Sequence, residues 1–202
     1  MPNIRKLPEA LPDKYVEFNS EKINCVFLGN LYHKIREPEY LFNLFSKINS
    51  NAVLYVVGEL IGISKSYIEE WVDKLDGKLV YCGRVSQEEA LAIISKADVL
   101  VNIGNVTTNQ CPSKVIDYIS TGKPIINIAK IDDCTSEVCL RKYPNKVLLN
   151  EKEKITDEVV LGVNRFLCAN KNGSCIPFER IQELYNDYTM DKMIDEFLVN
   201  SE

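Results

Sequence analysis

Short runs of consecutive apolar residues recur along the chain, and most are followed by glycine or a polar turn. Runs of this length without polar alternation are typical of strands that are buried on both faces of a parallel sheet. The pattern therefore predicts about six strands, at 23–28, 52–57, 79–81, 99–103, 124–128 and 146–149.

Between these runs, apolar positions recur every three or four residues, which is the spacing of an amphipathic helix. Ser66 with Glu69 and Ser86 with Glu89 each match a capping box, which satisfies the free N–H groups of a helix start. The segment 129–144 has no such period and is expected to be irregular. The predicted helices begin at Pro38, Ser66, Ser86 and Pro112 and then cover 155–169, 178–188 and 191–199.

Regular alternation of strands and helices predicts an α/β fold. We expect a Rossmann-like, doubly wound parallel sheet with helices on both faces and further helices at the C-terminus. Residues 1–21 contain three prolines and no sustained period, so we interpret them as an extended lead-in. The folded domain is expected to span 22–202.

Composition excludes several classes of function. No apolar run approaches the length of about 20 residues needed to cross a bilayer, and no signal peptide is evident, so we expect a soluble cytoplasmic protein. The net charge of −5 argues against a general nucleic-acid binder. The seven cysteines include no C-x-x-C pair, which favours reduced, structural thiols. Cys111 is the one candidate for a reactive thiol, because a helix N-terminus lowers the pKa of a nearby cysteine. A single histidine, His33, supports no metal site by itself, and the adjacent Asp132 and Asp133 are expected to be solvated loop charges. We therefore expect no metal site.

The most informative stretch is 111–126, CPSKVIDYISTGKPII, which predicts a short helix between two strands. A helix that begins at the end of a parallel strand directs its free N–H groups into the crevice beyond the sheet, where anions bind. Lys114 lies in the first turn, where a cation is unfavourable unless an anion is present. Asp117 follows one turn after Ser113 and can face the same crevice and accept hydrogen bonds from sugar hydroxyls.

The string PSKVIDYISTGKPII also resembles the signature segment of retaining GT-B glycosyltransferases close to family 4. The resemblance implies the C-terminal, donor-binding domain of a hexosyltransferase that acts in surface-glycan or polysaccharide biosynthesis. Its donor would be a nucleoside diphosphate sugar, with UDP favoured, and it would need no cofactor or metal. Residues 1–21 would then join a missing N-terminal acceptor domain, without which this chain is expected to be inactive. Any peripheral membrane association would come only through that missing domain.

The resemblance also implies roles for individual residues. Family members place two basic residues after the first strand, where this chain has Asn30 and, best matched to the second, Arg36. The family's two acidic residues correspond to Asn109, on the sugar side, and Asp117, on the ribose. Arg36 and Lys114 are the expected catalytic groups, which stabilise the leaving diphosphate. The remaining expected donor contacts are Arg84 and Val85 near the base, Gly58, which lets the backbone approach a ligand closely, Ser113, and the backbone N–H groups of Lys114 and Val115.

Two alternatives stay open at this point. One is a sugar-nucleotide epimerase of the same architecture, which the single histidine and Asn109 argue against because such enzymes rely on further acids and histidines. The other is a non-catalytic nucleotide-binding module.

Overall fold

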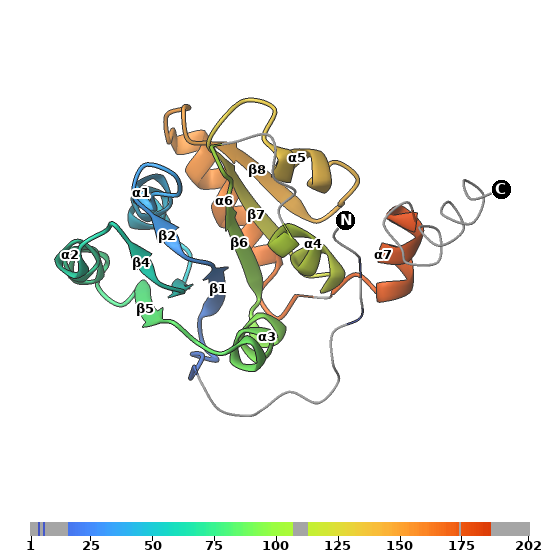
Figure 1. Cartoon of the computed structure of the whole chain (residues 1–202), viewed down its shortest axis with the longest axis horizontal. Helices are drawn as coiled ribbons and strands as arrows, with labels where there is room; N and C mark the ends of the chain where they lie inside the picture. The colour runs from blue at the N-terminus through green and yellow to red at the C-terminus, as the bar shows by residue number, and fades with distance from the viewer. Residues whose placement is uncertain (1–3, 5, 7–15, 107–112, 174, 187–202) are drawn as a thin grey trace.

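A parallel six-stranded sheet forms the centre of the molecule (Figure 1). The structure, a computed structural model, describes residues 4, 6, 16–106, 113–173 and 175–186. The strand order is β5-β3-β1-β6-β7-β8, and every pair of neighbours is parallel. This order is that of a Rossmann-like sheet, in which two halves meet between β1 and β6, so the predicted fold class is confirmed. The strands are β1 Ile23–Leu28, β3 Ala52–Val57, β5 Leu79–Gly83, β6 Val99–Ile103, β7 Ile125–Ala129 and β8 Lys146–Asn150.

A second, two-stranded sheet lies beyond the carboxyl ends of β1 and β3. It pairs β2, Leu31–Tyr32, with β4, Leu60–Ile61, in parallel. The hydrophobic pattern did not predict these strands, because two residues are too few to establish a period. They fix the course of the first two strand-to-helix loops.

Helices cover both faces of the main sheet, as the sequence predicts. Helices α1, α2 and α6 supply side chains to one hydrophobic cluster, and α3, α4, α5 and α7 supply side chains to the other. The helices are α1 Glu39–Lys47, α2 Lys65–Leu75, α3 Gln87–Lys96, α4 Ser113–Ser120, α5 Thr135–Leu140, α6 Asp157–Ala169 and α7 Phe178–Leu184.

Two predictions about local structure were wrong. The helix expected to begin at Ser66 starts at Lys65 instead, because Ser64 adopts the extended N-cap conformation and accepts a hydrogen bond from the Tyr67 N–H at 3.2 Å. Ser66 is therefore inside the first turn and caps nothing. Within 129–144, the structure contains α5, a six-residue helix too short to show a period. The capping box predicted at Ser86 is confirmed.

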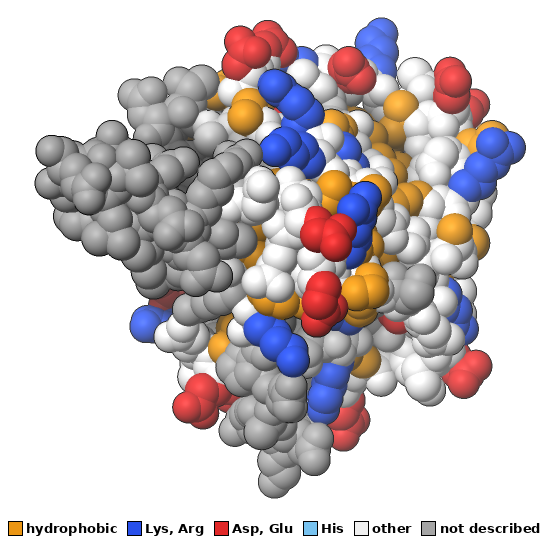
Figure 2. Space-filling view, turned by 90° about the vertical axis from the view of Figure 1, so that its right-hand side faces the viewer, with side chains coloured by type: hydrophobic (Ala, Val, Ile, Leu, Met, Phe, Trp, Pro, Cys, Tyr) orange, Lys and Arg blue, Asp and Glu red, His pale blue; other side chains and the backbone are white. Residues whose placement is uncertain are grey.

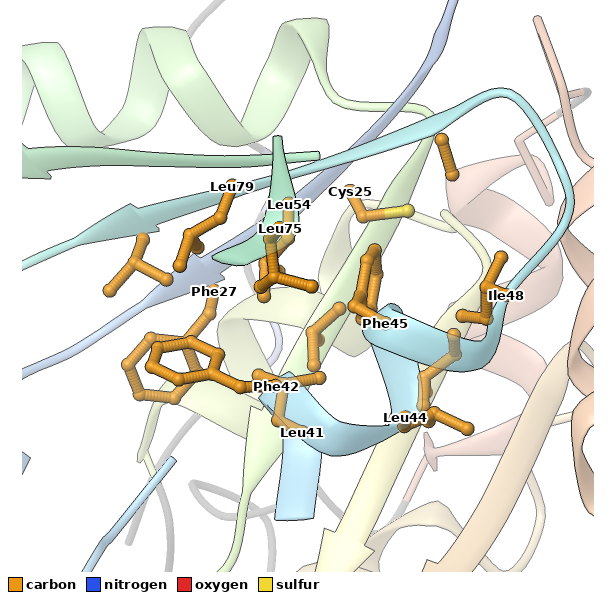
Figure 3. Packing of buried hydrophobic residues seen from close by; sticks show 14 of the residues in the cluster. Cys25, Phe27, Leu41, Phe42, Leu44, Phe45, Ile48, Leu54, Leu75 and Leu79 are labelled. Carbon is orange, nitrogen blue, oxygen red and sulfur yellow. The ribbon is translucent and has the colours of Figure 1, made fainter. Parts of the chain in front are cut away.

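The larger core lies between the sheet and helix α1 (Figure 3). Four side chains from two successive turns of α1 are fully buried against Cys25 and Phe27 of β1 and Leu54 of β3. Each fully buried side chain of this size contributes about 1.5–3 kcal/mol relative to exposure. This packing holds β1 rigidly, and β1 ends at the point where the candidate site begins. The four α1 side chains are Leu41, Phe42, Leu44 and Phe45.

The last part of the chain is described only to residue 186. Helix α7 confirms the start of the helix predicted at 178–188, whereas the predicted helix 191–199 lies outside the described residues. The face of the molecule on the α7 side carries basic and acidic side chains interspersed with hydrophobic ones (Figure 2). Among the described helices, none has the length and hydrophobicity that crossing a bilayer requires.

Candidate functional site

A crevice of about 460 Å³ opens at the carboxyl ends of the strands, at the point where the two halves of the sheet meet. Ligands bind at this position in open α/β sheets because the loops diverge there and helix N-termini point inward. Five segments supply its described walls: the ends of β1, β3 and β5, helix α3, and the first turns of α4. The lining includes Gly29, Asn30, Gly58, Glu59, Arg84, Val85, Leu91, Ile94, Ser113, Lys114, Asp117 and Tyr118.

The floor of the crevice depends on a close backbone approach between Gly58 and Gly29. A Cβ at Gly58 would lie only 2.1 Å from the carbonyl oxygen of Gly29, and the φ of Gly58 is +145°. Only glycine fits both conditions. The Asn30 side chain then joins the two loops, because its Oδ1 accepts a hydrogen bond from the Glu59 N–H at 3.0 Å.

Helix α4 is anchored to the end of β1 by a buried tyrosine. The Tyr118 hydroxyl accepts a hydrogen bond from the Leu28 N–H at 3.0 Å, and the side chain is 1% exposed. Burial raises the pKa of Tyr118, so the hydroxyl stays neutral. This contact directs the first turn of α4, with Ser113 and Lys114, into the crevice. Val115 packs into the core through its side chain, so only its backbone can serve a ligand.

Two cations converge on the backbone of Gly29. A Cβ placed there would lie 3.2 Å from Lys114 Nζ and 3.4 Å from Arg36 Nη1. Burial, and then repulsion from Arg36, lower the pKa of Lys114, whereas Asp117 opposes the shift. Burial also lowers the pKa of Arg36, against the nearby hydroxyls of Tyr32 and Tyr118. Two like charges held together in partly desolvated surroundings favour an anion between them.

The Arg36 guanidinium is fixed on one side only. One nitrogen donates to Asn105 Oδ1, and Nη1 donates to the Asn30 carbonyl at 3.5 Å. Its Nε is buried and has no hydrogen-bond partner among the described residues. A buried N–H group without an acceptor is costly.

Toward β5 and α3, the lining of the crevice changes from cationic to apolar. Val85, Leu91 and Ile94 give an apolar surface at this end. Outside it, Arg84 forms an ion pair with Glu59 at 3.1 Å, and both side chains are exposed. Exposed pairs contribute little to stability, so both groups remain available to a ligand. The crevice thus has an apolar end and a cationic end.

A second cavity, of about 530 Å³, adjoins the cationic end and shares Asn30 and Lys114 with the crevice. Its other lining residues come from the loop after β1 and from the residues that follow β6. They are Tyr32, Ile35, Arg36, Asn105 and Val106.

The structure brings most of the predicted site residues together. Those that line the crevice are Asn30, Gly58, Arg84, Val85, Ser113, Lys114 and Asp117, and Arg36 lies in the adjoining cavity. Asn109 and Cys111 lie outside the described residues. His33 lines a separate cavity and bonds to Glu37 at 2.8 Å. Sequence reasoning missed Asn105, although it follows a strand end as the other site residues do, and it missed Tyr118, which gives no sequence signal beyond a helical position.

Comparison with known families and structures gives a consistent result. The family described as glycosyl transferases, group 1, matches residues 22–167. No curated protein matches the chain in sequence.

Solved structures of similar fold are GT-B glycosyltransferases. The apo form of the lipopolysaccharide outer core galactosyltransferase WaaB has a TM-score of 0.62 and 14% identity, over 93% of this chain and 50% of that chain. Anabaena HepE in complex with UDP has a TM-score of 0.60 and 11% identity, over 89% of this chain and 49% of that chain. TarM has a TM-score of 0.62 and 14% identity, over 96% of this chain and 36% of that chain. At these identities the likeness shows the fold alone, and this chain spans about half or less of each structure.

Proposed function

The chain belongs to the group 1 glycosyltransferase family, and on that premise we propose that it is the C-terminal, donor-binding domain of a retaining enzyme. It holds a nucleoside diphosphate sugar, UDP-linked, in the crevice between the two halves of the sheet. One observation carries this proposal: Lys114, Arg36 and the first turn of α4 meet at the backbone of Gly29. Two cations and a helix N-terminus at one point fit a diphosphate.

The two ends of the crevice suit the two ends of a nucleotide. The apolar surface at Val85 and Leu91 suits the planar base, and Asp117, between that surface and the cations, suits the ribose hydroxyls. The diphosphate then lies at Lys114, Ser113 and the first turn of α4, with Arg36 Nη1 on the other side of Gly29. Solved structures of HepE contain UDP or UDP-glucose, which supports this assignment.

The chemical contribution of this domain is stabilisation of the leaving group. In the transfer step the bond between the anomeric carbon and the diphosphate oxygen breaks, and negative charge develops on the distal phosphate. Lys114, Arg36 and the dipole of α4 are already positioned at that charge. Their electrostatic stabilisation of the charge is strongest in a crevice that is partly shielded from water. We propose that these groups take the place of a metal ion.

The similar structures also support proposals about the acceptor domain and the pathway. The chain spans about half the length of the WaaB and HepE structures, which supports a further domain that binds the acceptor. WaaB is a lipopolysaccharide galactosyltransferase, which supports a role in surface-glycan synthesis and hexosyl transfer. This chain alone is expected to bind donor without turnover.

Calorimetric titration with UDP, GDP and uridine tests the proposal. We expect binding that requires the diphosphate, with UDP tighter than GDP. Lys114→Ala should weaken UDP binding by about 1.5–3 kcal/mol, or roughly ten- to a hundredfold, because a charge-assisted contact is lost. Lys65→Ala is the matched control, since Lys65 also lies in the first turn of a helix but is exposed and does not line the crevice. Equal binding of uridine and UDP, or no binding of either by folded protein, would favour a non-catalytic module.

A further inference from the structure

A hydrogen bond between Arg36 and Asn105 joins the two halves of the sheet. Arg36 lies in the loop after β1, and Asn105 comes two residues after the end of β6. Strands β1 and β6 are neighbours at the point where the halves meet, and both side chains line the second cavity. Nη2 of Arg36 donates to Asn105 Oδ1. The direction of the Arg36 guanidinium therefore depends on a residue from the other half.

The backbone just before Asn105 is held in place by β7 and by the start of α5. The Gly104 N–H donates a hydrogen bond to the Ile128 carbonyl at 2.8 Å. A Cβ at Gly104 would lie 2.6 Å from Cys134 Sγ, so this backbone packs closely against the N-cap residue of α5. Asn105 itself is half-buried. Its amide is thus supported by fixed backbone, which a group that orients another side chain requires.

Both acceptors of Arg36 are neutral. Nη2 donates to the Asn105 amide, and Nη1 donates to the Asn30 carbonyl at 3.5 Å. A charged group that is taken out of water is usually paired with an opposite charge. Among the described residues, however, no carboxylate forms an ion pair with Arg36. Neutral acceptors fix the guanidinium and leave its positive charge for an anion at Gly29, which Nη1 and Lys114 both approach.

We propose that Asn105 is a positioning residue for donor binding, whose neutral amide directs Arg36 at the diphosphate without neutralising it. This inference rests on the proposed function, in which Arg36 and Lys114 bind the diphosphate. Without the amide, the guanidinium would have to be ordered whenever a donor binds. Ordering one long side chain lowers an affinity by about two- to tenfold. An aspartate at position 105 would keep the hydrogen bond but would cancel the charge of Arg36 and repel the phosphates.

Calorimetric titration with UDP tests the inference in Asn105→Ala, Asn105→Asp, Arg36→Ala and the variant with both alanine substitutions. Asn105→Ala should weaken UDP binding by about two- to tenfold. Asn105→Asp keeps the shape of the side chain, so it tests the inference even if the alanine variant does not fold. It should bind UDP more weakly than Asn105→Ala, and the extra loss should shrink at high salt because charges are screened. The double variant should bind no more weakly than Arg36→Ala, because Asn105 acts through Arg36.

Asn164 provides the matched control for both substitutions. Its Oδ1 also accepts hydrogen bonds from a distant segment, at 3.1 Å from the Asn49 N–H and at 2.8 Å from the Ser50 N–H. It is half-buried and lines neither the crevice nor the second cavity. Asn164→Ala should lower the stability measured by urea unfolding, because two N–H groups lose their acceptor. Neither Asn164→Ala nor Asn164→Asp should change the affinity for UDP.

The outcomes separate this inference from the proposed function. Unchanged UDP affinity in both Asn105 variants overturns the inference alone. A loss on Asn105→Ala that persists in the Arg36→Ala background also overturns it, because Asn105 would then act by another route. Tighter binding by Asn105→Asp than by Asn105→Ala would overturn the role of the neutral acceptor. Failure of UDP to bind the folded wild-type protein overturns the proposed function, and the inference with it.

Discussion

Replacing Gly58 with alanine tests the backbone crossing that forms the floor of the crevice. The new Cβ would lie 2.1 Å from the Gly29 carbonyl oxygen and 2.5 Å from its carbon, where ordinary contact begins near 3.4 Å. These are backbone atoms at the end of the central strand, so they cannot rotate aside. The φ of +145° adds strain of about 1–3 kcal/mol for a side chain in a sparsely populated region.

Gly83 provides the matched comparison for this substitution. It also ends a strand of the same sheet and has a positive φ, +68°, but a Cβ there meets nothing within 4 Å. Gly83→Ala should therefore cost only the conformational penalty, about 1–2 kcal/mol. Gly58→Ala adds overpacking of about 1–3 kcal/mol to strain of about 1–3 kcal/mol, so its total should be about 2–6 kcal/mol.

Urea unfolding, followed by the fluorescence of the single tryptophan, Trp71, measures the difference. The side chain is 9% exposed in α2, so its emission should change on unfolding. Gly58→Ala should lower the midpoint without changing the slope, and by a larger shift than Gly83→Ala, with a difference in stability of about 1–3 kcal/mol. Equal stability losses in the two variants would show that the overlap with Gly29 costs nothing.

Three further predictions concern Tyr118, Glu37 and Lys114. Tyr118→Phe should lower the free energy of unfolding by about 1–3 kcal/mol, because the partly buried Leu28 N–H loses its acceptor; no loss in urea titrations would contradict this. A hydrogen bond from the Lys34 N–H to the Glu37 carboxylate lowers the pKa of Glu37. The ionised Glu37 therefore stabilises the folded protein above the unfolded pKa near 4.5, and this stabilisation is lost as pH falls through the folded pKa. Glu37→Gln should therefore be less stable than wild type at neutral pH and equal to it in acid, and a constant difference across pH would be inconsistent with that linkage. Because burial and Arg36 lower the pKa of Lys114, UDP binding should weaken with rising pH before ordinary lysines titrate, and Lys114→Met should remove this dependence in calorimetry.

The sequence predicts the main sheet well because its strands are buried on both faces. Continuous apolar runs such as 52–57 can be neither surface strands nor loops, so all six strands were found, with ends that differ by at most two residues. The features that were missed are short. Helix α5 has six residues and an N-cap residue, Cys134, whose side chain makes no capping hydrogen bond. Its burial depends on tertiary packing of Cys139 and Leu140, which no local pattern encodes.

The candidate site was predictable where residues follow strand ends. Lys114 and Asp117 line the crevice, as expected from an unfavourable cation and a carboxylate one turn later at the start of a helix. The contacts that hold them were not found. Tyr118 bonds to Leu28 across 90 positions of the chain, and Arg36 bonds to Asn105 across 69. Such pairs depend on which strands become neighbours, and a single sequence does not specify that order.

A crystal structure of the chain with UDP shows directly where the nucleotide binds. We expect the distal phosphate within hydrogen-bond distance of Lys114 Nζ and of the first turn of α4, with the base against Val85. The proposed function requires this arrangement. A nucleotide seated elsewhere, for example in the cavity of about 250 Å³ lined by His33 and Tyr67, with the crevice at Gly29 empty, would contradict it.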